Sequence, residues 1–417
     1  MGQGPRGPSA SATCRSAAAS IVGVTTLEAP VKRGPALLLG VAMVLAFVGG
    51  TIPSPLYGIY QEQLGWSTLV VTGVYAAYAL GTTFALIAFG RASDELGRRR
   101  VLLGGLAVGV VSALIFPLVE SLPLILLARV LSGISVGILA AASIAALAEL
   151  SPGGRLVGSR WGSIAQMIGL GSGPILAGLL AAWVARPLQV PYWTHIGLLL
   201  VSALLIMRVP DPGGRPEGGR LRPQRIAVPP EARGAFLRVA PGVFGALAVQ
   251  GFFAALASSF LRAEVGITSP IVIGLVGGSV FLATAVGAVS VARLGTERSL
   301  RLGSLALPAG LILAGVAVAT DTLAATVCAA VTGGAAVGLT LAAAVGEVNQ
   351  AAPEDRRAEA NAALLVVLYT AISVPSLGVG IMAQLTDLRT AIITFLGVVA
   401  VLALVSAVLV RRGLRDG

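Results

Sequence analysis

GRASDELGRRR, the sequence of residues 90–100, separates two apolar runs that are each long enough to cross a lipid bilayer. These runs cover roughly residues 68–89 and 101–119, and a membrane-spanning helix needs about 20 apolar residues at about 1.5 Å rise each. Gly90 and Gly97 let so short a loop reverse direction, because glycine tolerates positive φ. The stretch therefore predicts two antiparallel membrane helices joined by a tight polar loop.

The charged residues of this loop have natural partners nearby. The Asp94 carboxylate can reach the N-terminus of a neighbouring helix, where the helix macrodipole favours negative charge. Arg98, Arg99 and Arg100 can bind carboxylates or lipid phosphates with two hydrogen bonds each. A simple tight turn that carries loop charges remains the alternative interpretation.

The composition agrees with a membrane protein. Of the 417 residues, 56% are hydrophobic and only 11% are charged. A soluble domain carries about 25% charged residues because water must wet its surface. The exterior of this protein must therefore be mostly apolar and face lipid.

Apolar runs continue on both sides of the loop and predict an all-α integral membrane protein with twelve transmembrane helices in two six-helix halves. We place the spans at roughly 36–58, 68–89, 101–119, 123–148, 158–183, 191–208, 241–261, 270–292, 301–319, 322–347, 358–383 and 389–410.

The spans predict the domain organisation. We expect a disordered cytoplasmic tail (1–35), an N-terminal half (36–208), a cytoplasmic linker rich in Pro, Gly and Arg (209–240), a C-terminal half (241–410) and a short cytoplasmic tail (411–417). The halves look like distant repeats. Glu149 closes the fourth span and Glu347 closes the tenth, at an offset near 198 residues, and parallel halves are one known transporter architecture.

The basic residues predict the orientation. If the N-terminus is inside, the cytoplasmic segments hold 4, 4, 2, 7, 3, 2 and 3 basic residues, or 25 together, and the outer loops hold three. Cytoplasmic loops of membrane proteins carry an excess of Lys and Arg. We therefore expect both termini in the cytoplasm and the protein in the cell (plasma or inner) membrane.

Counting residue types excludes several functions. The net charge of +11 lies in short loop clusters, which argues against nucleic-acid binding. Two cysteines, Cys14 and Cys328, and one histidine, His195, argue against a metal site or a histidine proton relay. The only lysine, Lys32, has no phosphate-binding loop around it, which disfavours ATP-driven pumping. We expect no cofactor and no catalytic residues.

The loop of residues 90–100 resembles the signature loop of the major facilitator superfamily (MFS), G-x-x-x-D-x-x-G-R-[RK]-x. Helix number, halves and linker extend the resemblance over nearly the whole chain. The resemblance implies a conformational latch that is closed when the substrate site faces outward and broken when it faces inward. The latch residues are Gly90, Asp94, Gly97, Arg98, Arg99 and Arg100.

The fourth span looks like a second motif of the same family, an arginine followed by small residues. Gly133 and Gly137 share one face and allow a neighbouring backbone to approach closely. A charged residue inside a span is costly, so Arg129 is a candidate for a role in coupling. The alternative is that Arg129 extends its side chain to the nearby outer surface. Glu149, at the end of the same span, is the fourth candidate for coupling.

The fifth span resembles the antiporter motif of proton-driven drug exporters, a glycine run that ends in G-P-x-x-G-G. The matching residues are Gly169, Gly173, Pro174 and Gly178. The match is partial, because Ala177 replaces one glycine and Arg160 lies where an earlier glycine is expected. A packing kink at the proline is the alternative. In the first span, Pro53 and Pro55 indicate a bent or broken helix, with a possible counterpart at Pro375.

The polar residues of the spans bear on the substrate. All 18 carboxylates lie in loops, tails or helix ends, which argues for neutral, apolar or anionic cargo and leaves the proton-coupling residue unidentified. The candidates for the substrate cavity are Tyr78, Gln166, Gln250 and Tyr369, although hydrogen bonds between helices are the alternative role for each.

Together these features predict a secondary active transporter that works by alternating access. We expect proton-coupled efflux of small hydrophobic or neutral compounds by a monomer in the lipid bilayer. Proton-coupled uptake of a sugar or other small metabolite is the alternative. A membrane-embedded sensor or enzyme is a third reading, but neither catalytic groups nor an appended soluble domain is visible in the sequence.

Overall fold

The computed structural model describes residues 1–2, 33–211 and 225–413. Most of the expected N-terminal tail and the centre of the expected linker lie outside the described residues. All regular secondary structure in the described part is helical, and twelve helices there are long and apolar enough to cross a membrane. The predicted fold class is confirmed.

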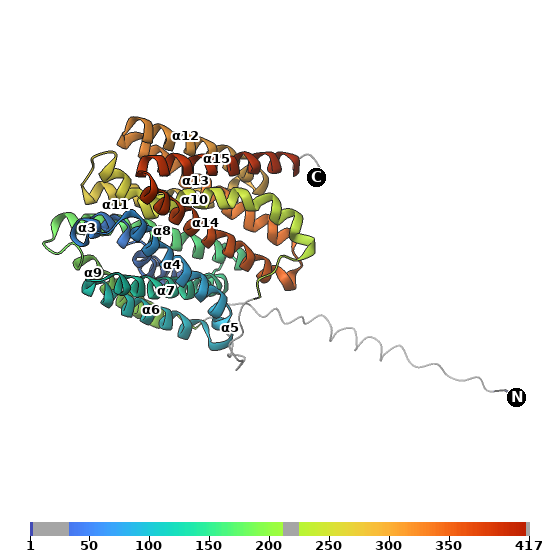
Figure 1. The fold of residues 1–417 in the computed structure, drawn as a ribbon. Coiled ribbons are helices and arrows are strands. Elements are labelled where there is room, and N and C mark those ends of the chain that lie inside the picture. Colours follow the sequence, from blue (N-terminus) through green and yellow to red (C-terminus); the bar gives the residue numbers. More distant parts are fainter. Residues whose placement is uncertain (3–32, 212–224, 414–417) are drawn as a thin grey trace. The chain divides into compact units, whose positions relative to one another are not determined.

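Six spans precede the undescribed segment at 212–224, and six follow it (Figure 1). The first six are built from α2 (Arg33–Phe47), η1 (Val48–Gly50), α3 (Pro53–Leu64), α4 (Thr68–Phe89), α5 (Ala92–Leu96), α6 (Arg98–Ile115), η2 (Phe116–Leu118), α7 (Leu122–Leu150), α8 (Arg155–Trp183) and α9 (Val190–Arg208). The second six are built from η3 (Pro230–Ala232), α10 (Arg233–Ala263), α11 (Pro270–Leu294), α12 (Thr296–Thr320), α13 (Leu323–Ala351), η4 (Glu354–Arg356), α14 (Arg357–Leu385) and α15 (Leu388–Gly413).

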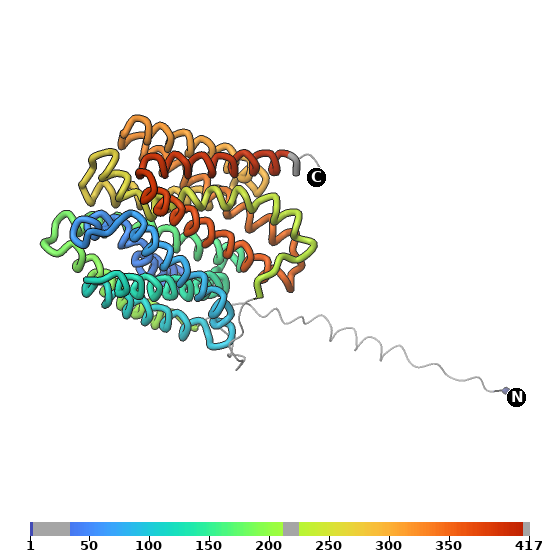
Figure 2. The backbone as a smooth tube through the Cα atoms, viewed as in Figure 1, coloured from blue at the N-terminus to red at the C-terminus, as the bar shows by residue number. Residues whose placement is uncertain are grey.

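Successive spans run in opposite directions, so their connections gather at two ends of the bundle (Figure 2). We call the end with the turn at Gly65, between α3 and α4, the Gly65 end. The opposite end, with the turn at Gly97 between α5 and α6, is the Gly97 end. Both turn glycines have positive φ, 67° and 94° respectively, as the sequence predicts for Gly97.

The first span is broken, as its prolines predict. α2 ends at Phe47, a 3₁₀ turn covers Val48–Gly50, and α3 begins with Pro53 in its first turn. Proline suits the first turn of a helix because the backbone N–H that it lacks would have no partner there. The region around Pro375 behaves differently, because α14 continues through that proline without a break.

The helix boundaries differ most from expectation at α10, which begins at Arg233 and therefore lies partly within the expected linker.

At the other end of the chain, α15 starts just after Asp387. The carboxylate of Asp387 accepts hydrogen bonds from the Thr390 hydroxyl (2.6 Å) and backbone N–H (2.9 Å). The Thr390 side chain, followed by the backbone bond, lowers the pKa of Asp387 below its ordinary value.

The outward faces of the spans are apolar. Large side chains such as Leu80 (68% exposed), Ile312 (68%) and Leu404 (65%) point away from the bundle. A surface so rich in exposed apolar side chains suits lipid and not water. Many of the residues buried between the helices are small, chiefly Ala, Gly and Ser, which lets the backbones pack closely.

Candidate functional site

Arg98, at the start of α6, is the centre of a charged cluster at the Gly97 end. Its guanidinium pairs with Asp94 of α5 (2.5 Å) and with Glu149 at the end of α7 (2.8 Å). Arg98 also donates from Nε to Glu149 Oε2 (3.5 Å) and from Nη1 to the Ser93 hydroxyl (2.5 Å). The cluster joins the short loop helix to two spans of the first half.

The predicted latch residues Gly90, Asp94, Gly97, Arg98, Arg99 and Arg100 thus lie together, and Glu149, predicted separately, joins them. Arg99 donates to the Met207 carbonyl at the end of α9, and Arg100 is exposed. Every described partner of this cluster belongs to the first six spans. In the second half, Glu347 at the end of α13 is the counterpart of Glu149, and it pairs with Arg238 of α10 (3.2 Å). The arginine that pairs with the glutamate therefore comes from a different helix position in each half.

Arg129 lies deep in the first half and is only 1% exposed. Its Nη1 donates to the carbonyl of Gly50 in the first-span break (3.1 Å), and its guanidinium lies 4.7 Å from the ring centre of Tyr78. The side chain does not reach the surface in this conformation, which argues against the alternative that it extends to the outer surface. None of the ion pairs in the described part of the chain involves Arg129.

Two tyrosine rings of α4 lie beside the Arg129 guanidinium, with ring centres 4.7 Å (Tyr78) and 6.0 Å (Tyr75) from its Cζ. A guanidinium over an aromatic face is stabilised by about 0.5–2 kcal/mol, more when water is excluded. Tyr78, which we predicted as a cavity residue, is therefore packed against Arg129.

The small residues that follow Arg129 bring α7 against α4. A Cβ added at Gly133 would lie 2.1 Å from the Tyr78 carbonyl oxygen, and one at Gly137 would lie 2.7 Å from the Ala85 Cβ. Only glycine fits at these two positions without moving a backbone. The motif thus places Arg129 at a fixed depth beside the broken first span.

The motif of the fifth span contacts both halves. Gly169 and Gly173 of α8 pack on the first span, where added Cβ atoms would lie 2.6 Å from Val44 O and 2.3 Å from Val48 O. On its other side, α8 packs on α11 of the second half. There, Cβ atoms added at Gly178 and Gly274 would lie 2.3 Å from Pro270 O and Pro174 O, respectively. The four predicted motif residues form this two-sided interface.

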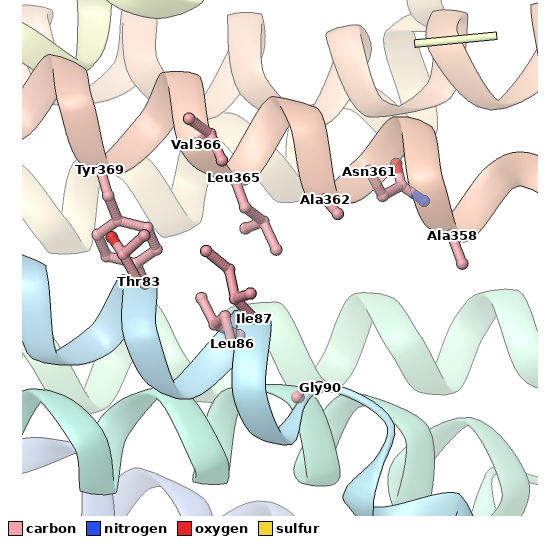
Figure 3. A pocket seen from close by; sticks show the side chains of 11 residues that line it. Thr83, Leu86, Ile87, Gly90, Ala358, Asn361, Ala362, Leu365, Val366 and Tyr369 are labelled. Carbon is pink, nitrogen blue, oxygen red and sulfur yellow. The ribbon is translucent and has the colours of Figure 1, made fainter. Parts of the chain in front are cut away.

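A cavity of about 160 Å³ lies between α4 and α14, one helix from each half. In Figure 3, Thr83, Leu86 and Ile87 point from α4 toward Tyr369 and Leu365 of α14. The cavity extends toward Gly90 and Ala358, which lie near the Gly97 end. Its lining residues are Thr83, Leu86, Ile87, Gly90, Ala141, Ala358, Asn361, Ala362, Leu365, Val366 and Tyr369.

Of the four predicted cavity residues, only Tyr369 lines this cavity. Gln250 is buried in α10 (6% exposed), and Gln166 is half-buried in α8. Sequence reasoning missed Asn361, whose amide nitrogen donates to Asn349 Oδ1 (2.9 Å) and whose own oxygen is buried without a partner among the described residues.

At the Gly65 end the two halves touch through α3 and α10. Gly58 N donates to the Ser258 hydroxyl (3.1 Å), the Ser259 hydroxyl donates to Gln61 (2.9 Å), and Arg262 pairs with Glu62. A further bond joins the Ser54 hydroxyl to the Ala254 carbonyl. The partners lie about 200 residues apart in the chain, close to the offset of 198 expected between the two halves.

Residues 39–261, slightly more than half of the chain, match the Major Facilitator Superfamily. The protein therefore belongs to this superfamily. An uncharacterised MFS-type transporter of Mycobacterium tuberculosis is 31% identical over 199 residues, which are 45% of this chain and 28% of that protein.

Two further relatives have named functions. A triacylglyceride transporter of Mycolicibacterium hassiacum is 30% identical over 172 residues (41% of this chain, 30% of the relative). The drug efflux pump JefA of M. tuberculosis is 29% identical over 154 residues (36% and 30%). The chain thus matches less than a third of the length of each of these relatives.

Solved structures share the fold across the whole bundle. A bacterial homolog of the human lysosomal transporter Spinster, in an inward-facing and unoccupied conformation, has a TM-score of 0.69 at 13% identity and covers 93% of this chain and 98% of its own. The nucleoside transporter NupG has a TM-score of 0.66 at 14% identity and covers 90% and 98%.

Proposed function

We propose that this MFS transporter exports small, uncharged, apolar compounds from the cytoplasm by alternating access, driven by protons. The observation that carries the proposal is the cavity between α4 and α14, which extends toward the Gly97 end while the halves meet at the Gly65 end. With the basic loops inside, the Gly97 end is cytoplasmic and the Gly65 end is outer. The structure then corresponds to a state that receives substrate from the cytoplasm, in which the described pairs of the latch residues stay within the first half and do not bridge to the second.

The lining of the cavity supports uncharged cargo. Its side chains are aliphatic except for Thr83, Asn361 and Tyr369, and none of its described lining residues carries a charge. A charged ligand would lose its hydration there without gaining an opposite charge, which is unfavourable. Two of the polar lining residues, Tyr369 and Asn361, are eight residues apart on α14, so they lie about 12 Å from each other along the cavity.

The size of the cavity supports a slender ligand or a partly open site. Ligand pockets occupy about 300–1,000 Å³, whereas this cavity holds about 160 Å³. A bulky compound therefore requires the halves to separate further at the Gly97 end. The names of two relatives, a drug efflux pump and a triacylglyceride transporter, accord with apolar cargo and outward transport.

The proposed cycle is a rocking of the two halves about their central contacts. Closure of the Gly97 end brings α4 and α14 together around the substrate. Opening of the Gly65 end separates α3 from α10, which breaks the pairs Glu62–Arg262 and Gly58–Ser258. The close α8–α11 interface holds the halves together through both states. One chain supplies both halves, so we propose that a monomer is sufficient.

A resistance assay tests this function. The gene is expressed in a bacterial host that lacks its own drug exporters, and growth is measured against a panel of neutral apolar, cationic and anionic toxic compounds. We expect several-fold higher resistance to neutral apolar compounds than with the Asp94→Asn variant at equal membrane levels. Increased sensitivity to these compounds would instead indicate uptake.

A further inference from the structure

A second, much smaller cavity lies inside the first half, beside the break in the first span. Its volume is about 10 Å³, and a cavity needs about 10–15 Å³ to hold one water. Its lining residues are Ala46, Gly49, Gly50, Gly109, Ser112, Ala113, Phe116, Ser132, Ser135, Val136, Tyr192 and His195. None of them belongs to the substrate cavity between the halves.

The wall of this cavity offers the partners that a buried water requires. His195 is 6% exposed, and its Nδ1 is buried without a hydrogen-bond partner in the described part of the chain. The Ser112 and Ser135 hydroxyls donate to the carbonyls of Ala128 and Gly105 (2.8 Å each), so their oxygens remain free to accept. An orphaned buried nitrogen costs about 1–3 kcal/mol, and a water with two to four polar partners removes that penalty.

His195 is the candidate proton acceptor within the spans, although its buried ring must become hydrated before it can hold a positive charge, because burial disfavours the charged form of histidine. Histidine is the side chain whose ordinary titration falls between pH 5 and 8, and His195 is the only histidine in the chain. All 18 carboxylates lie in loops, tails or helix ends. The count of histidines excludes a relay of several, but one histidine beside one water is enough for a single acceptor.

We propose that the small cavity is an internal water site and that His195, through this water, takes up the proton that drives transport. This inference rests on the proton coupling proposed above. His195 lies five residues, or about 7.5 Å, from the start of α9 at the Gly65 end. A proton that enters from the outer side thus has a short path once that end opens.

The position of the ring explains how a proton would move the first span. A Cβ at Gly49 would lie 2.0 Å from His195 Nε2, so the ring packs directly on the break. The carbonyl of the next residue, Gly50, accepts from Arg129 (3.1 Å). His195 and Arg129 therefore contact consecutive residues, Gly49 and Gly50, of the 3₁₀ turn η1.

The surroundings do not neutralise a second positive charge. The titratable side chains beside the lining residues are Arg129 of α7, which donates to the carbonyl of Gly50, and Tyr192 of α9, whose hydroxyl lies 3.4 Å from that of Tyr60 on α3. The lining segments of α2, η1, α6 and η2 contribute no titratable side chain, and none of the lining residues belongs to α8. A protonated ring would therefore repel Arg129 in a medium of low dielectric constant. The break would shift, and with it α3, which carries the contacts Gly58 and Glu62 of the Gly65 end.

The single histidine permits a direct test by solid-state NMR. The protein, carrying ¹⁵N-histidine and a tag without histidine, is reconstituted in phosphatidylcholine–phosphatidylglycerol liposomes. A cross-linkable form carries Gly58→Cys and Ser258→Cys together with Cys14→Ser and Cys328→Ser. A Cβ at Gly58 would lie 2.9 Å from Ser258 Oγ, so a cysteine there would be within bonding reach of one at 258 once the flexible Arg262 side chain, 2.2 Å from the added Cβ, moves aside.

We expect a bound-water contact to an imidazole nitrogen at about pH 8 in both the oxidised and the reduced form. On acidification to about pH 5 the reduced form should show the imidazolium signal, because opening of the Gly65 end hydrates the ring and returns it to the range in which histidine ordinarily titrates. The oxidised form, sealed at the Gly65 end, should remain neutral. Absence of the water contact, or the same titration in both forms, overturns the proposal.

The proposed function and this inference can fail separately. If transport is proton-driven but the imidazolium signal never appears in the reduced form, the proposed function stands and His195 is not the acceptor. If substrate flux does not depend on the pH gradient, transport is not coupled to protons. The proposed role of His195 in that coupling is then wrong as well.

Discussion

Arg98 and Glu149 form a two-point ion pair, with Nη2–Oε1 at 2.8 Å and Nε–Oε2 at 3.5 Å, between the start of α6 and the end of α7. Their side chains are 10% and 24% exposed. The pair therefore lies mostly out of water, where loss of one partner leaves an uncompensated charge. It fixes α6 to α7, and the bonds of Arg98 to Asp94 and Ser93 attach the loop helix α5 to both.

Glu149→Gln should weaken this cluster. The variant removes the charge but keeps the shape, so Arg98 retains Asp94 as its only charged partner and at most a neutral hydrogen bond to the new amide oxygen. A hydrogen bond to a charged group contributes about 1.5–3 kcal/mol, and we expect a loss of that order in the free energy of unfolding, measured by thermal denaturation in detergent. Glu297→Gln, which removes an exposed pair with Arg301, is the matched control and should change stability little. Equal shifts for both variants would contradict the structural role of Glu149.

Asp94→Asn should reduce transport without a comparable loss of stability. The Asp94 side chain is 58% exposed, so its pair with Arg98 contributes little to folding. Its proposed role is in switching between conformations. We expect normal expression and membrane insertion, with substrate efflux reduced several-fold. Unchanged efflux would show that Asp94 is not part of a latch.

Gly133→Ala should destabilise the first half. The new Cβ would lie 2.1 Å from the Tyr78 carbonyl oxygen, and overpacking of this kind costs about 1–3 kcal/mol. Gly104→Ala on α6 is the matched control, because no atom lies within 4 Å of its added Cβ. Thermal denaturation of the two variants should differ by several degrees. Equal melting temperatures would contradict the close α4–α7 contact.

Arg129→Lys should impair transport although it keeps the charge. Arginine donates from a planar fork and stacks on aromatic rings, whereas a lysine ammonium is a point charge. Lysine would therefore not reproduce both the bond to Gly50 O and the contact with Tyr78. We expect a loss of most of the efflux activity. Full activity of the lysine variant would favour a side chain that extends to the outer surface during the cycle.

Much of this architecture was predictable because membrane helices have a strong local signal. The lengths of the apolar runs located all twelve spans, and Pro53 and Pro55 predicted the break of the first span. The loop at Gly90–Arg100 predicted the family, which the match over residues 39–261 confirms. These features depend on residues that are close together in the chain.

Contacts between distant residues were harder to predict. Tyr78 and Tyr369 both looked like polar groups near mid-membrane, yet only Tyr369 lines the cavity, because the helix rotation of α4 turns Tyr78 toward Arg129. The role of Asn361 depends on where α13 ends and α14 begins in space. The roles of the predicted latch, coupling and antiporter residues stay predictions.

Transport in everted membrane vesicles tests the central claim most directly. Vesicles from the exporter-deficient host expose the cytoplasmic face outward, and an acidified lumen supplies the proton gradient. With a compound identified by the resistance assay, we predict uptake into the lumen that collapses when the gradient is dissipated and is reduced several-fold in the Asp94→Asn variant. Accumulation in right-side-out vesicles under external acid, with none in everted vesicles, would contradict proton-driven export.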